Sequence, residues 1–176
     1  MPGGSGRRNL QDNRGSPEKG RAATERLMRR DKVVAVTGGH QSSVCLAEIE
    51  VAHRYKTPYI DTNCWSDDIR KKGYPEVFNP GNYNTRVSTA MAETIAALKV
   101  KSGVAFAENT DYGVGQGKLL GEILQKLAPQ INYKYVALDR AGKDFTPDVL
   151  PLRASPPEMV VNIMLPPAAY ILMNQW

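Results

Sequence analysis

The chain has 176 residues, 41% of them hydrophobic, which is enough for one or two compact α/β units. No run approaches the roughly 20 apolar residues that span a bilayer, and residues 1–15 lack the apolar core of a secretory signal peptide. The net charge of +5 lies entirely in residues 1–32, since residues 33–176 carry equal numbers of acidic and basic side chains. Nucleic-acid-binding modules more often spread basic side chains over a folded face, so we predict no nucleic-acid partner.

The beginning of the chain predicts a disordered or extended segment over residues 1–15, followed by a helix. Ser16 supplies a capping hydroxyl and Pro17 favours the first helical position, and this helix is expected to end near Asp31. A valine-rich run over residues 33–36 predicts a buried strand. The elements expected next are a helix over residues 42–54, a strand over 59–61, a helical turn over 67–71 and an extended pair at 77–78.

The rest of the chain predicts two amphipathic helices among further strands. Their expected inward faces are Val87, Met91, Thr94, Ile95 and Leu98 in residues 85–98, and Leu119, Leu120, Ile123, Leu124 and Leu127 in residues 115–127. The expected strands are residues 103–107, 131–138 and 159–164, and a short helix follows Pro166-Pro167. This alternation predicts parallel sheets covered by helices. Because a doubly wound sheet needs a central strand and none precedes Pro17, we expect the chain to be part of a longer fold.

Three segments follow predicted strands, where open α/β sheets bind their ligands. The first segment, residues 38–43, contains two glycines and opens a helix. Backbone N–H groups at a helix start, together with the hydroxyls of Ser42 and Ser43, favour a carboxylate, and Gln41 lies beside them. An ordinary serine N-cap is the alternative explanation for this segment.

The second segment, residues 61–68, offers Asn63 as both hydrogen-bond donor and acceptor, with Cys64 and Trp65 next to it. Trp65 supplies a flat apolar wall and one N–H, or else packs inward in a capped loop. The third segment, residues 108–115, offers Tyr112 as a cover for a ligand, or as a tyrosine packed on its own loop.

Motifs for catalysis, cofactors or metals are incomplete. Gly113, Gly115 and Gly117 miss the G-x-G-x-x-G spacing, and no lysine has the spacing of a Walker motif. Ser42 and Ser43 lie outside a G-x-S-x-G motif, and the two cysteines form no C-x-x-C pair. We therefore predict a protein that is not an enzyme, with no catalytic residue, cofactor or metal.

Several short motifs occur in a fixed order over about residues 9–176. They are residues 12–19 (DNRGSPEK), residues 31–33 (DKV) followed by Gly38 and Ser42-Ser43, Lys72-Gly73-Tyr74, Phe78, residues 107–113 (AENTDYG) and Lys143-Asp144-Phe145. Together they resemble type I periplasmic binding proteins of the branched-chain amino-acid transport group. The resemblance implies an α/β fold of two Rossmann-like lobes with parallel sheets flanked by helices, incomplete in this chain. Partial lobe 1 would cover residues 16–79, and part of lobe 2 would cover residues 80–176.

The resemblance also implies a function. The chain would be the solute-binding component of an ABC importer and would capture a small polar ligand, an amino acid or a related carboxylate or amide, in the cleft between lobes. Its partners would be that ligand and a membrane-embedded ABC permease, and its location would be periplasmic or extracellular. Two alternatives are a ligand-sensing regulatory or receptor domain of the same fold, and a nucleotide-dependent α/β enzyme.

The resemblance further implies that Ser42 binds the ligand carboxylate and that Tyr112 contacts the ligand from lobe 2. The positions of Asn63 and Trp65 would bind the carboxylate and ammonium groups. Small residues are usual there, so the bulkier Asn63, Cys64 and Trp65 predict a smaller pocket or stacking on a flat ligand. Cys45 and Cys64 lie away from the family's known disulfide, which favours two free buried thiols. We also expect the chain alone to be marginally stable and to bind ligand weakly or not at all.

Overall fold

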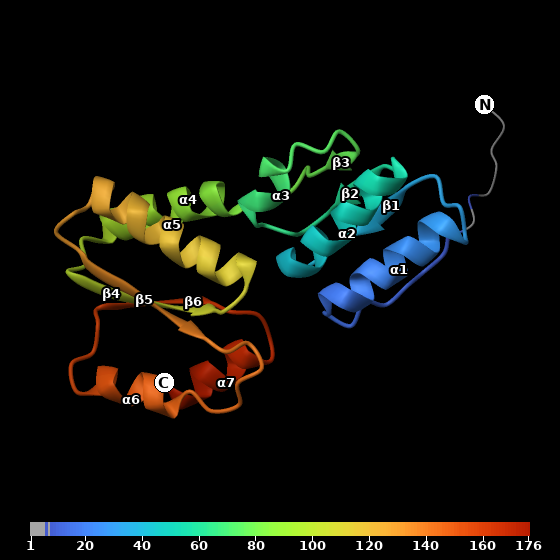
Figure 1. Ribbon diagram of the computed structural model, residues 1–176. Coiled ribbons are helices and arrows are strands. Elements are labelled where there is room, and N and C mark those ends of the chain that lie inside the picture. Colours follow the sequence, from blue (N-terminus) through green and yellow to red (C-terminus); the bar gives the residue numbers. More distant parts are fainter. Residues whose placement is uncertain (1–5, 7) are drawn as a thin grey trace. The chain divides into compact units, whose positions relative to one another are not determined.

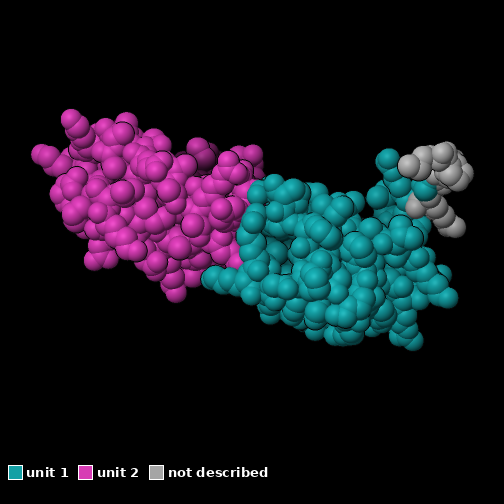
Figure 2. All heavy atoms as spheres, turned by 90° about the horizontal axis from the view of Figure 1, so that it is seen from above, with its two compact units in different colours: residues 1–64, 68–81 teal, residues 65–67, 82–176 magenta. Residues whose placement is uncertain are grey.

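The computed structural model describes residue 6 and residues 8–176, which divide into two compact units. Unit 1 consists of the chain up to Cys64 together with Asp68–Gly81, and unit 2 consists of Trp65–Asp67 and Asn82–Trp176 (Figure 2). The polypeptide therefore passes between the units after Cys64, after Asp67 and after Gly81. Part of the predicted extended segment, residues 1–5 and 7, lies outside the described residues. In the described part, no helix has the length and apolar character needed to cross a membrane.

Unit 1 begins with α1, Pro17–Arg29, as the sequence predicts. Ser16 is its N-cap, and the Ser16 hydroxyl accepts a hydrogen bond from the Lys19 N–H at 3.4 Å. Before this helix, the Asn13 amide donates to the buried carboxylate of Glu48 at 3.1 Å, which attaches this segment to the second helix, Ser42–Tyr55.

The sheet of unit 1 is parallel and has the order β1-β2-β3. Its elements are β1 (Val36–Gly38), α2 (Ser42–Tyr55), β2 (Tyr59–Asp61), α3 (Asp67–Lys71) and β3 (Val77–Phe78) (Figure 1). The expected strand over residues 33–36 is wrong by about three residues, because pairing with β2 starts only at Val36, and Val34 is 91% exposed. Helices α1 and α2 pack on each other, and α2 supplies Ile49 and Val51 to the core.

Unit 2 contains a second parallel sheet, with the order β5-β4-β6. Its strands are β4 (Ser102–Glu108), β5 (Asn132–Leu138) and β6 (Met159–Ile163), and its helices are α4 (Asn84–Leu98), α5 (Asp111–Leu127), α6 (Thr146–Arg153) and α7 (Ala168–Gln175). Helices α4 and α5 cover one face of the sheet, and α6 and α7 cover the other (Figure 1). The predicted fold class, parallel sheets flanked by helices, is confirmed.

The central strand β4 shows why this sheet is covered on both sides. Alternate side chains of a strand point to opposite faces. Val104 and Phe106 pack against α6 and α7, while Ala105 and Ala107 pack against α4 and α5. All four side chains are fully buried, so the strand reads as a continuous apolar run rather than an alternating one.

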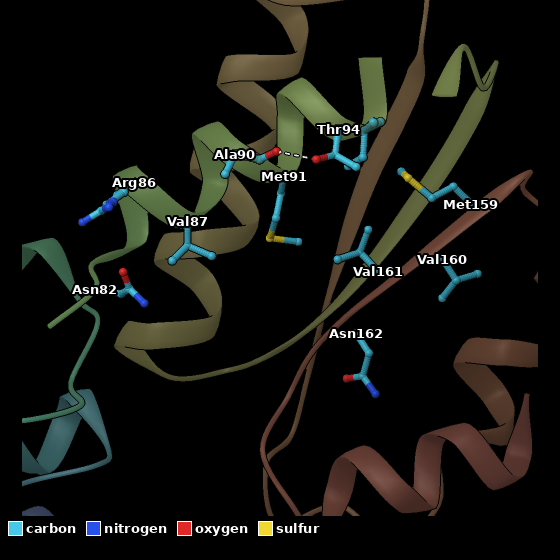
Figure 3. Close-up of a pocket in the computed structure, with 11 residues that line it drawn as sticks. Asn82, Arg86, Val87, Ala90, Met91, Thr94, Met159, Val160, Val161 and Asn162 are labelled. Carbon is cyan, nitrogen blue, oxygen red and sulfur yellow. Dashed lines mark hydrogen bonds between the residues drawn. The ribbon is translucent and has the colours of Figure 1, made fainter. Parts of the chain in front are cut away.

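The expected inward face of α4 is partly wrong. Ser88, Ala92 and Ile95 are its buried side chains in the middle and end of the helix, whereas Leu98 is 64% exposed. Small residues on this face allow α5 to approach closely, and that contact decides which face turns inward. Val87 and Met91 instead line an open groove of about 650 Å³ between α4 and β6 (Figure 3).

Candidate functional site

The first two candidate segments lie side by side in unit 1. Strands β1 and β2 are parallel and in register from Val36 and Tyr59 to Gly38 and Asp61, so the loops that follow them leave the same edge of the sheet. The Thr62 hydroxyl donates to the carbonyl oxygens of Gly38 (3.2 Å) and Gly39 (3.3 Å). The Asn63 amide nitrogen lies 2.8 Å from Nδ1 of His40. The structure therefore joins two segments that are about 20 residues apart in sequence.

The first loop leads directly into α2. Gln41 is the N-cap residue, and its side chain makes no capping hydrogen bond. Ser42 and Ser43 lie inside the first turn, so the serine-cap alternative is wrong. The side-chain amide of Gln41 lies over Gly15, and its Oε1 is buried without a hydrogen-bond partner among the described residues. The N–H groups at the start of α2 are thus not capped by the side chain that precedes them.

Asp61 determines the shape of the second loop. Its carboxylate is fully buried at the end of β2 and accepts hydrogen bonds from the N–H groups of Cys64 (2.8 Å) and Asn63 (3.1 Å). The amide of Asn79 donates to the other carboxylate oxygen and to the Cys64 carbonyl at 3.2 Å. Burial raises the pKa of Asp61, and the hydrogen bonds from Cys64, Asn63 and Asn79 oppose that rise.

A disulfide joins Cys45 to Cys64, so the expectation of free thiols is wrong. Cys45 lies one helical turn after Ser42 and is fully buried, and its Cα is 6.5 Å from that of Cys64, within the range that a disulfide spans. Cys45, Asp61 and Cys64 bring three potential metal-ligand atoms within 4.8 Å of one another. Because the two sulfur atoms are bonded to each other, only the Asp61 carboxylate could coordinate an ion in this state.

The other two candidate residues, Trp65 and Tyr112, lie together in unit 2. Their ring centroids are 5.9 Å apart and the rings meet edge to face at 78°. Asn84 at the start of α4 links both backbones, since its N–H donates to the Trp65 carbonyl (2.6 Å) and its amide donates to the Tyr112 carbonyl (3.0 Å). Trp65 is therefore grouped with Tyr112 rather than with its sequence neighbours Asn63 and Cys64.

Helix α5 begins at Asp111, four residues before the predicted start. Thr110 is its N-cap, and the Thr110 hydroxyl donates to the buried carboxylate of Glu108 at 2.7 Å. Tyr112 thus stands in the first helical turn, where burial, reinforced by the charge of Glu108, raises its pKa to about 12. Its hydroxyl stays protonated at neutral pH and can donate a hydrogen bond.

The glycines near Tyr112 serve packing rather than phosphate binding. They lie inside α5 and not in a loop before it. A Cβ atom on Gly113 would overlap the backbone of Glu108, and one on Gly117 would come within 3.0 Å of the Tyr135 ring. These close approaches explain why a glycine-rich sequence occurs here without a phosphate-binding spacing.

Sequence reasoning missed Asp61, Asn79 and Asn84 as residues that shape these loops. An aspartate that ends a short strand and precedes a polar turn is a recognisable signal for side-chain capping of a loop. The partners Asn79 and Asn84 carry no local signal, because each acts on a segment that is distant in sequence.

A family model described as "Periplasmic binding protein" matches residues 10–176. No curated protein matches the chain. Among solved structures, an extracellular ligand-binding receptor from Rhodopseudomonas palustris HaA2 superposes with a TM-score of 0.84 at 20% identity, covering 94% of this chain and 46% of that one. The leucine binding protein LivK from Thermotoga maritima gives 0.79 at 22% identity, with coverage of 86% and 43%.

A third similar structure is a solute-binding protein of an ABC transporter from R. palustris, solved in complex with benzoate. It gives a TM-score of 0.80 at 17% identity, and the match covers 88% of this chain and 43% of that one. The chain thus spans less than half the length of the solved structures that it matches.

Proposed function

Because this chain belongs to the type I periplasmic binding protein family, we propose that it is the solute-binding component of an ABC importer and captures a small carboxylate. The family match confirms the predicted family and the prediction of a binding protein rather than an enzyme. We assign unit 1 to lobe 1 and unit 2 to lobe 2, and we propose ligand contacts in each of them separately. Periplasmic or extracellular location and a membrane permease as partner belong to the same proposal.

One observation carries the assignment of a carboxylate. The N-terminus of α2 follows the glycine turn at residues 38–39, is not capped by Gln41, and stands beside the loop that Asp61 holds in place. Helix N-termini carry partial positive charge and unsatisfied N–H groups, which favour an anion. Gln41, Ser42, Ser43, Asn63 and Cys64 are the contacts proposed from unit 1.

Trp65 and Tyr112 are the contacts proposed from unit 2, and they favour a flat ligand. An aromatic pair offers stacking and edge contacts, and the protonated Tyr112 hydroxyl adds a donor. The names of two similar proteins are consistent with either an amino acid or an aromatic acid, since one is a leucine binding protein and another is complexed with benzoate. We propose an aromatic carboxylate in preference to a branched-chain amino acid, because the flat side chain of Trp65 offers a stacking surface for a planar ring.

Titration calorimetry of the full chain with benzoate, 4-hydroxybenzoate, leucine and benzamide tests this function. We expect the aromatic carboxylates to bind, with low affinity because the chain spans less than half the length of the similar solved structures, and benzamide, which lacks the charge, to bind at least tenfold more weakly. Ser42→Ala is expected to weaken carboxylate binding about 10- to 100-fold, the range for a hydrogen bond to a charged group. Ser16→Ala is the matched control, because Ser16 also begins a helix of unit 1 but caps α1 instead.

Equal binding by wild type and Ser42→Ala would contradict the placement of the carboxylate. Binding of nucleotides without binding of any carboxylate would contradict the transport function and favour the enzyme alternative. A DNA-binding or membrane-spanning domain encoded in the same gene would favour the ligand-sensing alternative.

A further inference from the structure

We propose that the Cys45–Cys64 disulfide positions the two ligand loops of unit 1, and that its oxidised state is required for their binding geometry. Both cysteines act as positioning residues through the backbone on either side of them. The inference rests on the proposed function, because the loops that the disulfide joins are those proposed to hold the carboxylate.

The disulfide links the loops close to their proposed contact residues. Cys45 is three residues after Ser42, on the first turn and a half of α2, and Cys64 directly follows Asn63. The bond therefore connects the helix start to the second loop, and both sulfur-bearing residues are at most 1% exposed.

The glycine turn of the first loop rests directly on this disulfide. Gly39 has φ +88°, a conformation that favours glycine. A Cβ atom on Gly39 would overlap Sγ of Cys45, and it would come within 3.1 Å of both Sγ of Cys64 and the Tyr59 hydroxyl. The sulfur atoms therefore limit how closely the backbone of Gly39 can approach α2 and the second loop. This limit also influences the direction in which the chain continues after Gly39.

Buried polar groups surround the disulfide and leave it little room. The Tyr59 hydroxyl donates to the buried carboxylate of Glu48 and lies 3.8 Å from Sγ of Cys45. On the other side, Asp61 Oδ1 lies 4.0 Å from Sγ of Cys45 and also accepts the Cys64 N–H. The packing around both sulfur atoms therefore comes from side chains that are themselves held by hydrogen bonds.

Reduction would change this geometry and not only the chain connectivity. A dithiol reductant breaks the S–S bond with two electrons, two S–H bonds form, and the reductant becomes a cyclic disulfide. Bonded sulfur atoms are about 2 Å apart, whereas atoms in van der Waals contact are about 3.5–4.0 Å apart. Because Tyr59, Asp61 and Gly39 lie against the sulfur atoms, we expect the thiols to separate by a movement of the loop at Cys64 or of the start of α2.

The test compares the wild-type chain, Cys45→Ala/Cys64→Ala, and Val51→Ala. Val51 is fully buried in the same core and lies six residues beyond Cys45 on α2, outside both loops, so its truncation destabilises unit 1 while leaving the disulfide in place. Two measurements are made at a temperature where all three are folded: calorimetric affinity for benzoate, and hydrogen exchange of the amides in residues 39–45 and 61–65. Wild type treated with a dithiol reductant, then reoxidised, replaces the double variant if that variant does not fold.

We expect the double variant or the reduced chain to bind benzoate at least tenfold more weakly and to exchange the loop amides at least tenfold faster. Val51→Ala is expected to retain affinity within about twofold, and reoxidation is expected to restore wild-type values. Unchanged affinity and loop exchange without the disulfide would overturn the positioning role, even with a lowered melting temperature. If wild type binds no carboxylate, the proposed function fails, while loop exchange in the double variant still decides the positioning role.

Discussion

Unit 1 and unit 2 each contain a three-stranded parallel sheet in the described part of the chain, but different interactions hold the two sheets. The strands of unit 2 have 7, 7 and 5 residues, and helices cover both faces of that sheet with aliphatic and aromatic side chains. The strands of unit 1 have only 3, 3 and 2 residues. Its interior includes the carboxylates of Glu48 and Asp61, the Tyr59 hydroxyl and a disulfide.

The two kinds of interior contribute differently to the fold: apolar burial mainly adds stability, and buried polar groups mainly fix geometry. Apolar burial is non-directional and grows with the area removed from water. Buried polar networks contribute less net stability, but they fix geometry because each unpaired group is costly. In unit 1 the polar network and the disulfide converge beneath the two loops proposed to bind the carboxylate. Unit 2 contributes an aromatic pair carried by a larger apolar core, which also buries the Glu108 carboxylate with hydrogen bonds from Thr110 and Leu165.

Phe106→Ala tests the apolar character of unit 2 and should have the largest effect. Phe106 is fully buried on the central strand and packs with Val149, Leu172 and their neighbours. Truncation of such a side chain costs about 3–5 kcal/mol in the free energy of unfolding. Hydrogen exchange measured at increasing urea concentration should show loss of protection in unit 2, while amides of unit 1 keep theirs.

Leu98→Ala is the matched control for this truncation, because Leu98 is 64% exposed on α4. We expect it to change stability by less than about 0.5 kcal/mol. Equal loss of protection in both units after Phe106→Ala would mean that the two units unfold as one, and the contrast between them would not extend to folding.

Asp61→Asn tests the polar character of unit 1 through its pH dependence. Burial raises the pKa of Asp61 above its ordinary value of 3.8, so the folded state binds this proton more tightly than the unfolded chain. The stability of wild type relative to the variant should therefore fall as pH rises from 3.8 through the raised pKa, and stay constant above it. The slope for one proton is at most about 1.4 kcal/mol per pH unit. Urea unfolding between pH 4 and 7 measures it.

Asp144 in unit 2 supplies the opposite sign as a control. Hydrogen bonds from Thr146 and Gln175 lower the pKa of its exposed carboxyl. The stability it contributes is present above 3.8 and is lost as pH falls through the lowered pKa. Asp144→Asn should therefore leave the profile between pH 4 and 7 parallel to that of wild type, whereas Asp61→Asn should not. Parallel profiles for both variants would contradict a raised pKa for the buried Asp61 carboxyl.

Local signals allowed much of the secondary structure to be predicted. The cap and proline at Ser16 and Pro17 gave the start of α1, and the predicted helix over residues 42–54 differs from α2 by one residue. The positions of the first two candidate loops followed from the strand-to-helix pattern. Whether Ser42 and Asn63 contact a ligand stays a prediction.

Features decided by distant partners were not predictable from local patterns. The start of β1 depends on where β2 offers hydrogen bonds, and the buried face of α4 depends on the small residues that meet α5. The disulfide depends on the register between β1 and β2, which brings Cys45 to Cys64. Trp65 joined unit 2 because the N–H of Asn84 binds its carbonyl, a contact across 19 residues.

The smallest predicted effect compares the ends of one helix from each unit. Lys56 after α2 and Lys99 after α4 both have left-handed backbones, with φ of 53° and 56°. This conformation costs a non-glycine residue about 1–2 kcal/mol, and the greater freedom of glycine in the unfolded chain offsets about 0.4–1 kcal/mol of the gain. Lys99→Gly should therefore raise the free energy of unfolding by about 0.5 kcal/mol in urea titrations, and Lys99→Ala should not. Lys56→Gly should gain less, since Lys56 also pairs with Glu76 at 3.3 Å, another specific contact in unit 1; an equal gain at both sites would show that this ion pair adds nothing.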